Sequence, residues 1–134
     1  MEVTSAVLAG IVAHARREAP RECCGLLVGT SEGMLIDEAI PTANLEPGTT
    51  RYVVNPAEHV ALMKRLRGTG REIVGGYHSH PRSPAVPSST DVAEAFSAAF
   101  LYLIVSLLDP RQPDLRAYRI SGEEIQELAL VASQ

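Results

Sequence analysis

The stretch GGYHSHPRSPAVPSSTD, from Gly75 to Asp91, carries the spacing that decides how this sequence folds. It contains two histidines, His78 and His80, separated by one residue. Because successive side chains of a β-strand point to opposite faces, both imidazoles would lie on one face and Ser79 on the other. Asp91 follows His80 by eleven residues, beyond a turn rich in proline. In the first turn of a helix, this aspartate could fold back toward the imidazoles as a third metal ligand.

Each part of this stretch also has a purely structural explanation. Two exposed histidines on a strand are commoner than a metal site. Ser88 and Asp91 form the pattern of a helix start, with Ser88 as the N-cap and an acidic residue three positions on. Taken together, however, the pattern His-X-His-X7-Ser-X2-Asp fixes four residues at three spacings. Three such ligands would leave tetrahedral zinc one open position, which is the mark of a catalytic zinc site.

This pattern resembles the metal-binding signature of the JAMM (JAB1/MPN/Mov34) metalloproteases and departs from it nowhere. The resemblance implies that His78, His80 and Asp91 bind one zinc ion per chain. It also implies that Ser88 supports the bound water or the oxyanion, and that a glutamate far upstream acts as the acid/base.

Glu22 stands where that glutamate is expected. It lies in PRECCGLLVG, positions 20–29, which is similar to the family's Glu-X-Cys-Gly strand. The structural alternative is an exposed acid at a strand start, paired with Arg21 or a similar residue. The adjacent Cys23 and Cys24 do not favour a disulfide. As strand neighbours they face opposite ways, so at least one is expected to be a small core residue; a catalytic thiol is the alternative.

The rest of the chain predicts one compact domain over residues 1–134, because the length suits one domain and is too short for two ordinary ones. Apolar periodicity and turn signals predict three helices and six or seven strands. The helices are expected from Thr4 or Ser5 to Pro20, from Asn55 to the glycines at 68–70, and over 89–98. The strands are expected over 23–28, 34–40, 51–54, 72–80, 100–108, 115–120 (as an edge strand) and 125–131, with a surface loop over 41–50.

Within these elements, some side chains have a predicted environment. The helix after Asn55 is expected to bury four apolar residues, Val60, Leu62, Met63 and Leu66. His14 is expected on the surface of the first helix, and His59 is expected to be solvated. Gly25, Gly75 and Gly76 suggest that another backbone or a ligand comes close to these strands.

The predicted elements suit an α/β (α+β mixed) domain with a largely antiparallel sheet. The resemblance implies the same fold, a curved mixed sheet flanked by helices and related to the cytidine deaminase fold.

Composition limits the class of partner. The net charge of −4 argues against a nucleic-acid binder, which would usually show a basic balance. The longest apolar run, 98–108, is about half the ~20 residues that a membrane span requires, which predicts a buried strand. The first residues show no secretory signal, so the cytoplasm is the expected location.

Three functions follow from these residues. The first is a zinc peptidase or isopeptidase that cleaves after the Gly-Gly-type C-terminal tail of a ubiquitin-like or sulfur-carrier protein, the substrate class that the resemblance implies. The second is a non-catalytic interaction scaffold of the same fold, against which the complete set of site residues speaks. The third is a zinc deaminase, which needs a His-X-Glu and a Pro-Cys-X-X-Cys; neither occurs in the chain.

Overall fold

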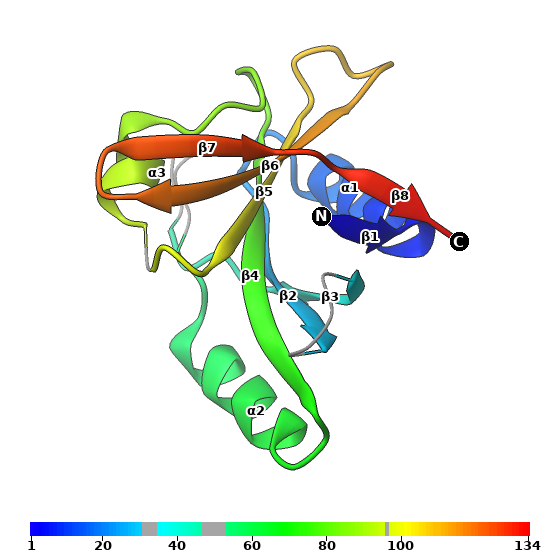
Figure 1. Cartoon of the computed structure of the whole chain (residues 1–134). Coiled ribbons are helices and arrows are strands. Elements are labelled where there is room, and N and C mark those ends of the chain that lie inside the picture. The colour runs from blue at the N-terminus through cyan, green and yellow to red at the C-terminus, as the bar shows by residue number, and fades with distance from the viewer. Residues whose placement is uncertain (31–34, 47–52, 96) are drawn as a thin grey trace.

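A curled eight-stranded mixed sheet forms the centre of the protein, with strands in the order β7-β6-β5-β4-β2-β3-β1-β8 (Figure 1). The computed structural model describes residues 1–30, 35–46, 53–95 and 97–134. The strands are β1 (Glu2–Thr4), β2 (Cys24–Thr30), β3 (Leu35–Thr42), β4 (Arg71–His80), β5 (Leu101–Ser106), β6 (Asp114–Ser121), β7 (Glu124–Leu128) and β8 (Val131–Ser133). The helices are α1 (Ser5–Glu18), α2 (Pro56–Leu66) and α3 (Ser89–Ala93).

The pairing of the strands is mostly antiparallel. Strand β2 pairs antiparallel with both β3 and β4, and β6 does so with both β5 and β7. The parallel pairs are β4 with β5, β1 with β3, and β1 with β8. The prediction of a mixed, largely antiparallel sheet is therefore confirmed.

The helices lie on opposite faces of the sheet. Helix α1 packs Val7 and Ile11 against a core that includes Leu27, Tyr77 and Leu103. On the other face, Leu62 and Leu66 of α2 pack against β2, and residues around α3 pack against β5 and β6. In Figure 1, α2 lies beside the start of the long strand β4 and α3 lies near β6 and β7. None of the helices in the described ranges is both long and apolar enough to cross a membrane.

Two of the predicted close approaches come from glycines in the sheet. A Cβ on Gly25 would lie 2.2 Å from the ring of Tyr77. A Cβ on Gly75 would lie 2.2 Å from the carbonyl oxygen of Leu101 in the parallel strand β5. Real Cβ atoms do not approach other atoms so closely, so a side chain at either position would force its neighbour to move.

Several predicted elements differ from the structure. The segment 115–120 is not an edge strand, because the turn at Gly122 returns the chain and β7 pairs along it. The predicted strand 125–131 is interrupted, with β7 and β8 pairing with different partners. Helix α3 ends at Ala93, earlier than predicted. In the segment 51–54, residues 51 and 52 lie outside the described residues, and Val54 forms only an isolated bridge with Asn44.

Some predicted side-chain environments are also wrong. Val60 and Met63 of α2 are 49% and 56% exposed, because α2 meets the sheet through Leu62 and Leu66 alone. His14 is buried, and its Nδ1 lies 2.8 Å from the hydroxyl oxygen of Tyr77. The hydrogen bond explains why a polar side chain is accommodated on the inner face of α1.

Candidate metal centre

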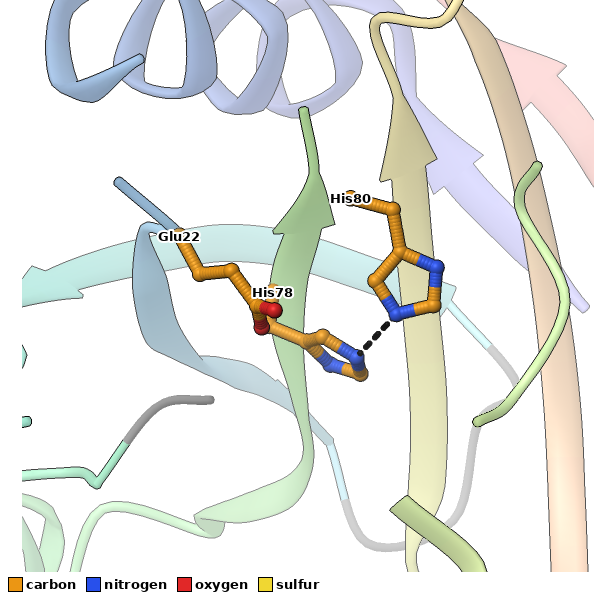
Figure 2. Close-up of side chains that lie close together, drawn as sticks. All are labelled: Glu22, His78 and His80. Atoms are coloured by element: carbon orange, nitrogen blue, oxygen red, sulfur yellow. Dashed lines mark hydrogen bonds between the residues drawn. The ribbon is translucent and has the colours of Figure 1, made fainter. Parts of the chain in front are cut away.

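Strand β4 brings two imidazoles to the face of the sheet that α2 and α3 cover. His78 and His80 are buried, with 1% and 4% exposure, while Tyr77 and Ser79 point to the α1 face. The alternation predicted from the sequence is therefore confirmed. The Nε2 atoms of the two histidines lie 3.2 Å apart (Figure 2).

Asp91 reaches the imidazoles from α3, as the spacing predicts. Its Oδ2 lies 3.1 Å from the Nε2 of His78 and 3.1 Å from the Nε2 of His80. The three atoms thus form a triangle with edges of 3.1 to 3.2 Å. Ligand atoms about 2.0 Å from a tetrahedral zinc ion would be about 3.3 Å apart. The arrangement of the three side chains therefore fits a zinc ion bound on one face of the triangle.

Local hydrogen bonds orient two of these side chains, His80 and Asp91. The Nδ1 of His80 lies 2.8 Å from the carbonyl oxygen of Pro84, to which it can only donate. In the neutral imidazole the proton is then on Nδ1, and the lone pair of Nε2 faces the site. Ser88 and Asp91 form a capping box: the Ser88 N–H donates to Asp91 Oδ2 at 2.8 Å, and the Asp91 N–H donates to Ser88 Oγ at 3.0 Å. The start of α3 therefore fixes the direction of the Asp91 carboxylate.

Glu22 lies beside the two imidazoles, immediately before β2. Its carboxylate and one nitrogen of each histidine lie within 4.8 Å of one another. Figure 2 shows the carboxylate pointing toward His78 from the neighbouring chain segment. Glu22 is buried, with 5% exposure, so the alternative of an exposed acid at a strand start is wrong.

Burial and charge shift the pKa values of these groups in different directions. Burial raises the pKa of Glu22 to about 7, although the nearby His80 opposes this shift. Burial also opposes ionisation of Asp91, but hydrogen bonds with His78 and His80 outweigh it and hold the pKa of Asp91 well below its ordinary value. Burial lowers the pKa of His78, which favours the neutral imidazole that a metal requires.

The cysteines do not take part in this cluster. Cys23 belongs to the core on the α1 face, and burial raises the pKa of its thiol to about 12. Burial also raises the pKa of Cys24, whose sulfur lies 3.4 Å from the hydroxyl oxygen of Thr42. Because thiolates are the reactive form, neither residue suits a nucleophile. The prediction that at least one of the two cysteines is a small core residue is confirmed.

The structure also shows supporting contacts that the sequence pattern did not indicate. They are the Pro84 carbonyl that orients His80, and the side chains of Ser79 and Asn44, which hydrogen-bond to the backbone next to Glu22. In the sequence, the position of Ser79 between the two histidines is the one signal that points to such a supporting contact. Asn44 stands in a segment rich in turn formers, where an asparagine is unremarkable by type.

Three converging side chains that could hold a metal ion, on the helix-covered face of a curled mixed sheet, are the arrangement that the resemblance to JAB1/MPN domains predicts. The chain belongs to the prokaryotic homologs of the JAB domain, whose family model matches residues 4–121. The predicted family is therefore confirmed.

Two relatives have informative names. The chain is 38% identical over 128 residues to the desampylase of Haloferax volcanii, covering 90% of this chain and 87% of the relative. It is 36% identical over 117 residues to the CysO-cysteine peptidase of Mycobacterium tuberculosis, covering 87% of this chain and 80% of the relative. These names support the prediction of a hydrolase.

Solved structures confirm the fold. A solution structure of a protein from Desulfitobacterium hafniense matches with a TM-score of 0.90 and 31% identity, covering 99% of this chain and 92% of that one. A crystal structure of a JAB1/MPN domain protein from Archaeoglobus fulgidus matches with a TM-score of 0.66 and 22% identity over the full length of both chains.

Proposed function

We propose that this chain is a zinc-dependent peptidase or isopeptidase that hydrolyses the amide bond after the C-terminal tail of a ubiquitin-like or sulfur-carrier protein. The observation that carries the proposal is the convergence of three ligand atoms, from His78, His80 and Asp91, next to the buried carboxylate of Glu22. An interaction scaffold would not need this combination of buried polar side chains, which is costly to maintain without a bound metal.

His78, His80 and Asp91 would hold the zinc ion through Nε2, Nε2 and Oδ2. When bound with one open position, zinc supplies an acidified water and polarises a carbonyl group. Amide hydrolysis needs both, because neither water nor an amine leaving group is reactive enough at neutral pH.

Glu22 would serve as the general base and then the general acid. A carboxylate that has a pKa of about 7 populates both protonation states at neutral pH. It can therefore accept a proton from the attacking water at Oε and later deliver one to the departing amine. Such proton transfer typically contributes ~10²–10⁴ to a rate.

Ser88 would donate a hydrogen bond to the oxyanion that develops on the scissile carbonyl. Its Oγ accepts from the Asp91 N–H, which leaves the hydroxyl hydrogen available as a donor. The capping contact therefore keeps the hydroxyl next to Asp91, one of the proposed ligands. Loss of one oxyanion donor costs on the order of 10²–10³ in rate.

The proposed substrate class rests on the names of the relatives and on the shape of such tails. A Gly-Gly-type tail is narrow and extended and has no bulky side chains, so it suits a tight cleft. Its carboxyl end would present the scissile bond, and the amine on the other side could belong to a lysine or to a free amino acid.

The test is cleavage of a ubiquitin-like protein whose Gly-Gly tail is joined to a lysine-containing peptide through either the α-amine or the ε-amine. We expect the zinc-loaded wild type to cleave at least one of the two, and a chelator to abolish the activity until zinc is restored. Glu22→Gln should retain zinc and lose ~10²–10⁴ of the rate. An active Glu22→Gln protein would contradict the assignment of the base, and no cleavage by the zinc-loaded wild type would contradict the substrate class.

A further inference from the structure

The peptide group between Glu22 and Cys23 lies just outside the regular sheet. Strand β2 begins at Cys24, whose partner in β4 is His78. The peptide that connects the proposed base to the sheet therefore depends on other partners for its polar atoms. Side chains of other residues hydrogen-bond to its N–H group and to its carbonyl group.

Ser79 holds the N–H end of this peptide. The Cys23 N–H donates to Ser79 Oγ at 2.8 Å, and the Ser79 N–H donates in return to the Cys23 carbonyl at 3.2 Å. Ser79 is completely buried and stands between the two histidines of β4. The strand that presents the proposed metal ligands therefore also binds the backbone next to the proposed base. It does so through Ser79, whose side chain lies on the face opposite the two imidazoles.

Asn44 holds the C=O end of the same peptide. Its Nδ2 donates to the Glu22 carbonyl at 2.9 Å. Its Oδ1 accepts from the N–H groups of Glu46 at 2.9 Å and of Val53 at 2.8 Å. An amide side chain can do this because it is both donor and acceptor. The three bonds fix its orientation, so the Glu22 carbonyl meets a rigid donor.

We propose that Ser79 and Asn44 are positioning residues that hold the Glu22–Cys23 peptide plane and thereby aim the Glu22 carboxylate at the metal centre. This inference rests on the proposed role of Glu22 as the base. Without the two bonds, the peptide could rotate about its flanking dihedral angles and swing the Glu22 side chain away from His78 and His80. A displacement of about 1 Å at a reacting group can cost ~10²-fold in rate.

The structure offers variants that separate this role from general support of the fold. Ser79→Ala removes the acceptor for the Cys23 N–H, and Ser79→Thr restores a hydroxyl with a residue suited to strands. Asn44→Asp keeps an acceptor for Glu46 and Val53 but loses the donor to Glu22. Thr42→Val is the matched control, because the Thr42 hydroxyl donates to the carbonyl of Cys24 at 3.2 Å, one residue beyond the held peptide.

The measurements are kcat, KM and zinc content on the Gly-Gly fusion substrate, together with hydrogen exchange of the Cys23 amide. We expect Ser79→Ala and Asn44→Asp to lower kcat by roughly 10- to 100-fold, with KM and zinc content close to those of the wild type. Ser79→Thr should recover most of the rate, and Thr42→Val should stay near the wild type. In Ser79→Ala the Cys23 amide should exchange roughly five- to tenfold faster.

Three results would overturn the inference. One is that both variants match Thr42→Val in kcat. Another is that they lose zinc, which would make their role one of support for the ligand strand. The third is unchanged hydrogen exchange of the Cys23 amide in Ser79→Ala. This result would contradict the inference even if the wild type cleaves no fusion substrate and the proposed function fails. If Ser79→Ala does not fold, Asn44→Asp and Ser79→Thr carry the same comparison.

Discussion

Gly25 stands opposite Tyr77 in the antiparallel pair of β2 and β4. The Tyr77 ring lies across Gly25, and its hydroxyl reaches His14 of α1. One glycine therefore makes room for the aromatic residue that joins the proposed metal-binding strand to the first helix.

We predict that Gly25→Ala destabilises the protein by roughly 1–3 kcal/mol, because the added methyl group must displace the buried ring. Gly10→Ala is the matched control. Gly10 lies within α1 with open space around its Cβ position, and alanine should stabilise the helix by about 0.5–1 kcal/mol. Urea denaturation of both variants measures the difference; equal stabilities would contradict the described packing.

His14 shows that the apolar periodicity of a helix does not determine on which face a polar residue lies. The apolar residues of α1 repeat every three to four positions, and the polarity of His14 predicts that it lies on the outer face. In the structure it lies on the inner face, beside Ala15, because Tyr77 offers its hydroxyl there. Burial, followed by the charge of Arg17, lowers the pKa of His14 below 6.5.

This shift predicts a pH dependence of stability. The folded state binds a proton at His14 less readily than the unfolded chain does, in which the imidazole titrates near pH 6.5. The stability is therefore fully present above that pH and decreases as the pH falls below it. In metal-free protein, the wild type should lose more of its unfolding free energy between pH 7 and pH 5 than His14→Gln does. Equal losses in the two proteins would show that the pKa of His14 is not lowered in the folded state.

At the scale of elements, the start of the short helix α3 contributes both to the stability of the fold and to the proposed chemistry. Its N-cap, Ser88, orients Asp91 through the capping box and is also the proposed oxyanion donor. The sequence offered the cap and the donor as alternative explanations of one residue, but the geometry allows both, because the two roles use different atoms of the hydroxyl group.

We predict that Ser88→Ala keeps zinc but lowers kcat by about 10²–10³, while the lost cap costs about 1 kcal/mol of stability. Ser88→Asp separates the two roles, since aspartate is a good N-cap but, when ionised, has no hydrogen to donate. It should recover stability without recovering kcat. Full activity in Ser88→Asp would show that capping is the whole contribution of this residue.

The elements also show where sequence patterns are ambiguous. Helix α2 has apolar residues on two adjacent stripes, and the periodicity does not decide which stripe faces the sheet. Leu62 and Leu66 do so, and Val60 and Met63 remain exposed. For β6, alternation suggested an edge strand, but a pattern within one strand contains no information on whether a later strand will pair with it.

At the scale of the whole molecule, the family and the fold were predictable because the histidines, serine and aspartate lie close in sequence at fixed spacings. The local geometry of a strand, a turn and a helix start then brings them together. Pairings between distant segments were not predictable. Strand β1 lies between β3 and β8, so the two ends of the chain are side by side (Figure 1), and neither β1 nor this pairing has a periodic signal.

The same distinction applies to the site. Glu22 lies far from the histidines in sequence and was found through the resemblance of its segment to a family motif. The contacts of Ser79 and Asn44 with its backbone depend on tertiary structure and on no spacing within the chain.

The most direct test of the central claim is the zinc content of the purified protein, measured for the wild type and for a His78→Ala/His80→Ala double variant. His59→Ala is the control, because His59 lies on α2 outside the proposed ligand set. We predict one zinc per chain in the wild type and in His59→Ala, and none in the double variant. A wild type that takes up no zinc when it is supplied, or a double variant that retains it, would contradict the assignment of the metal centre.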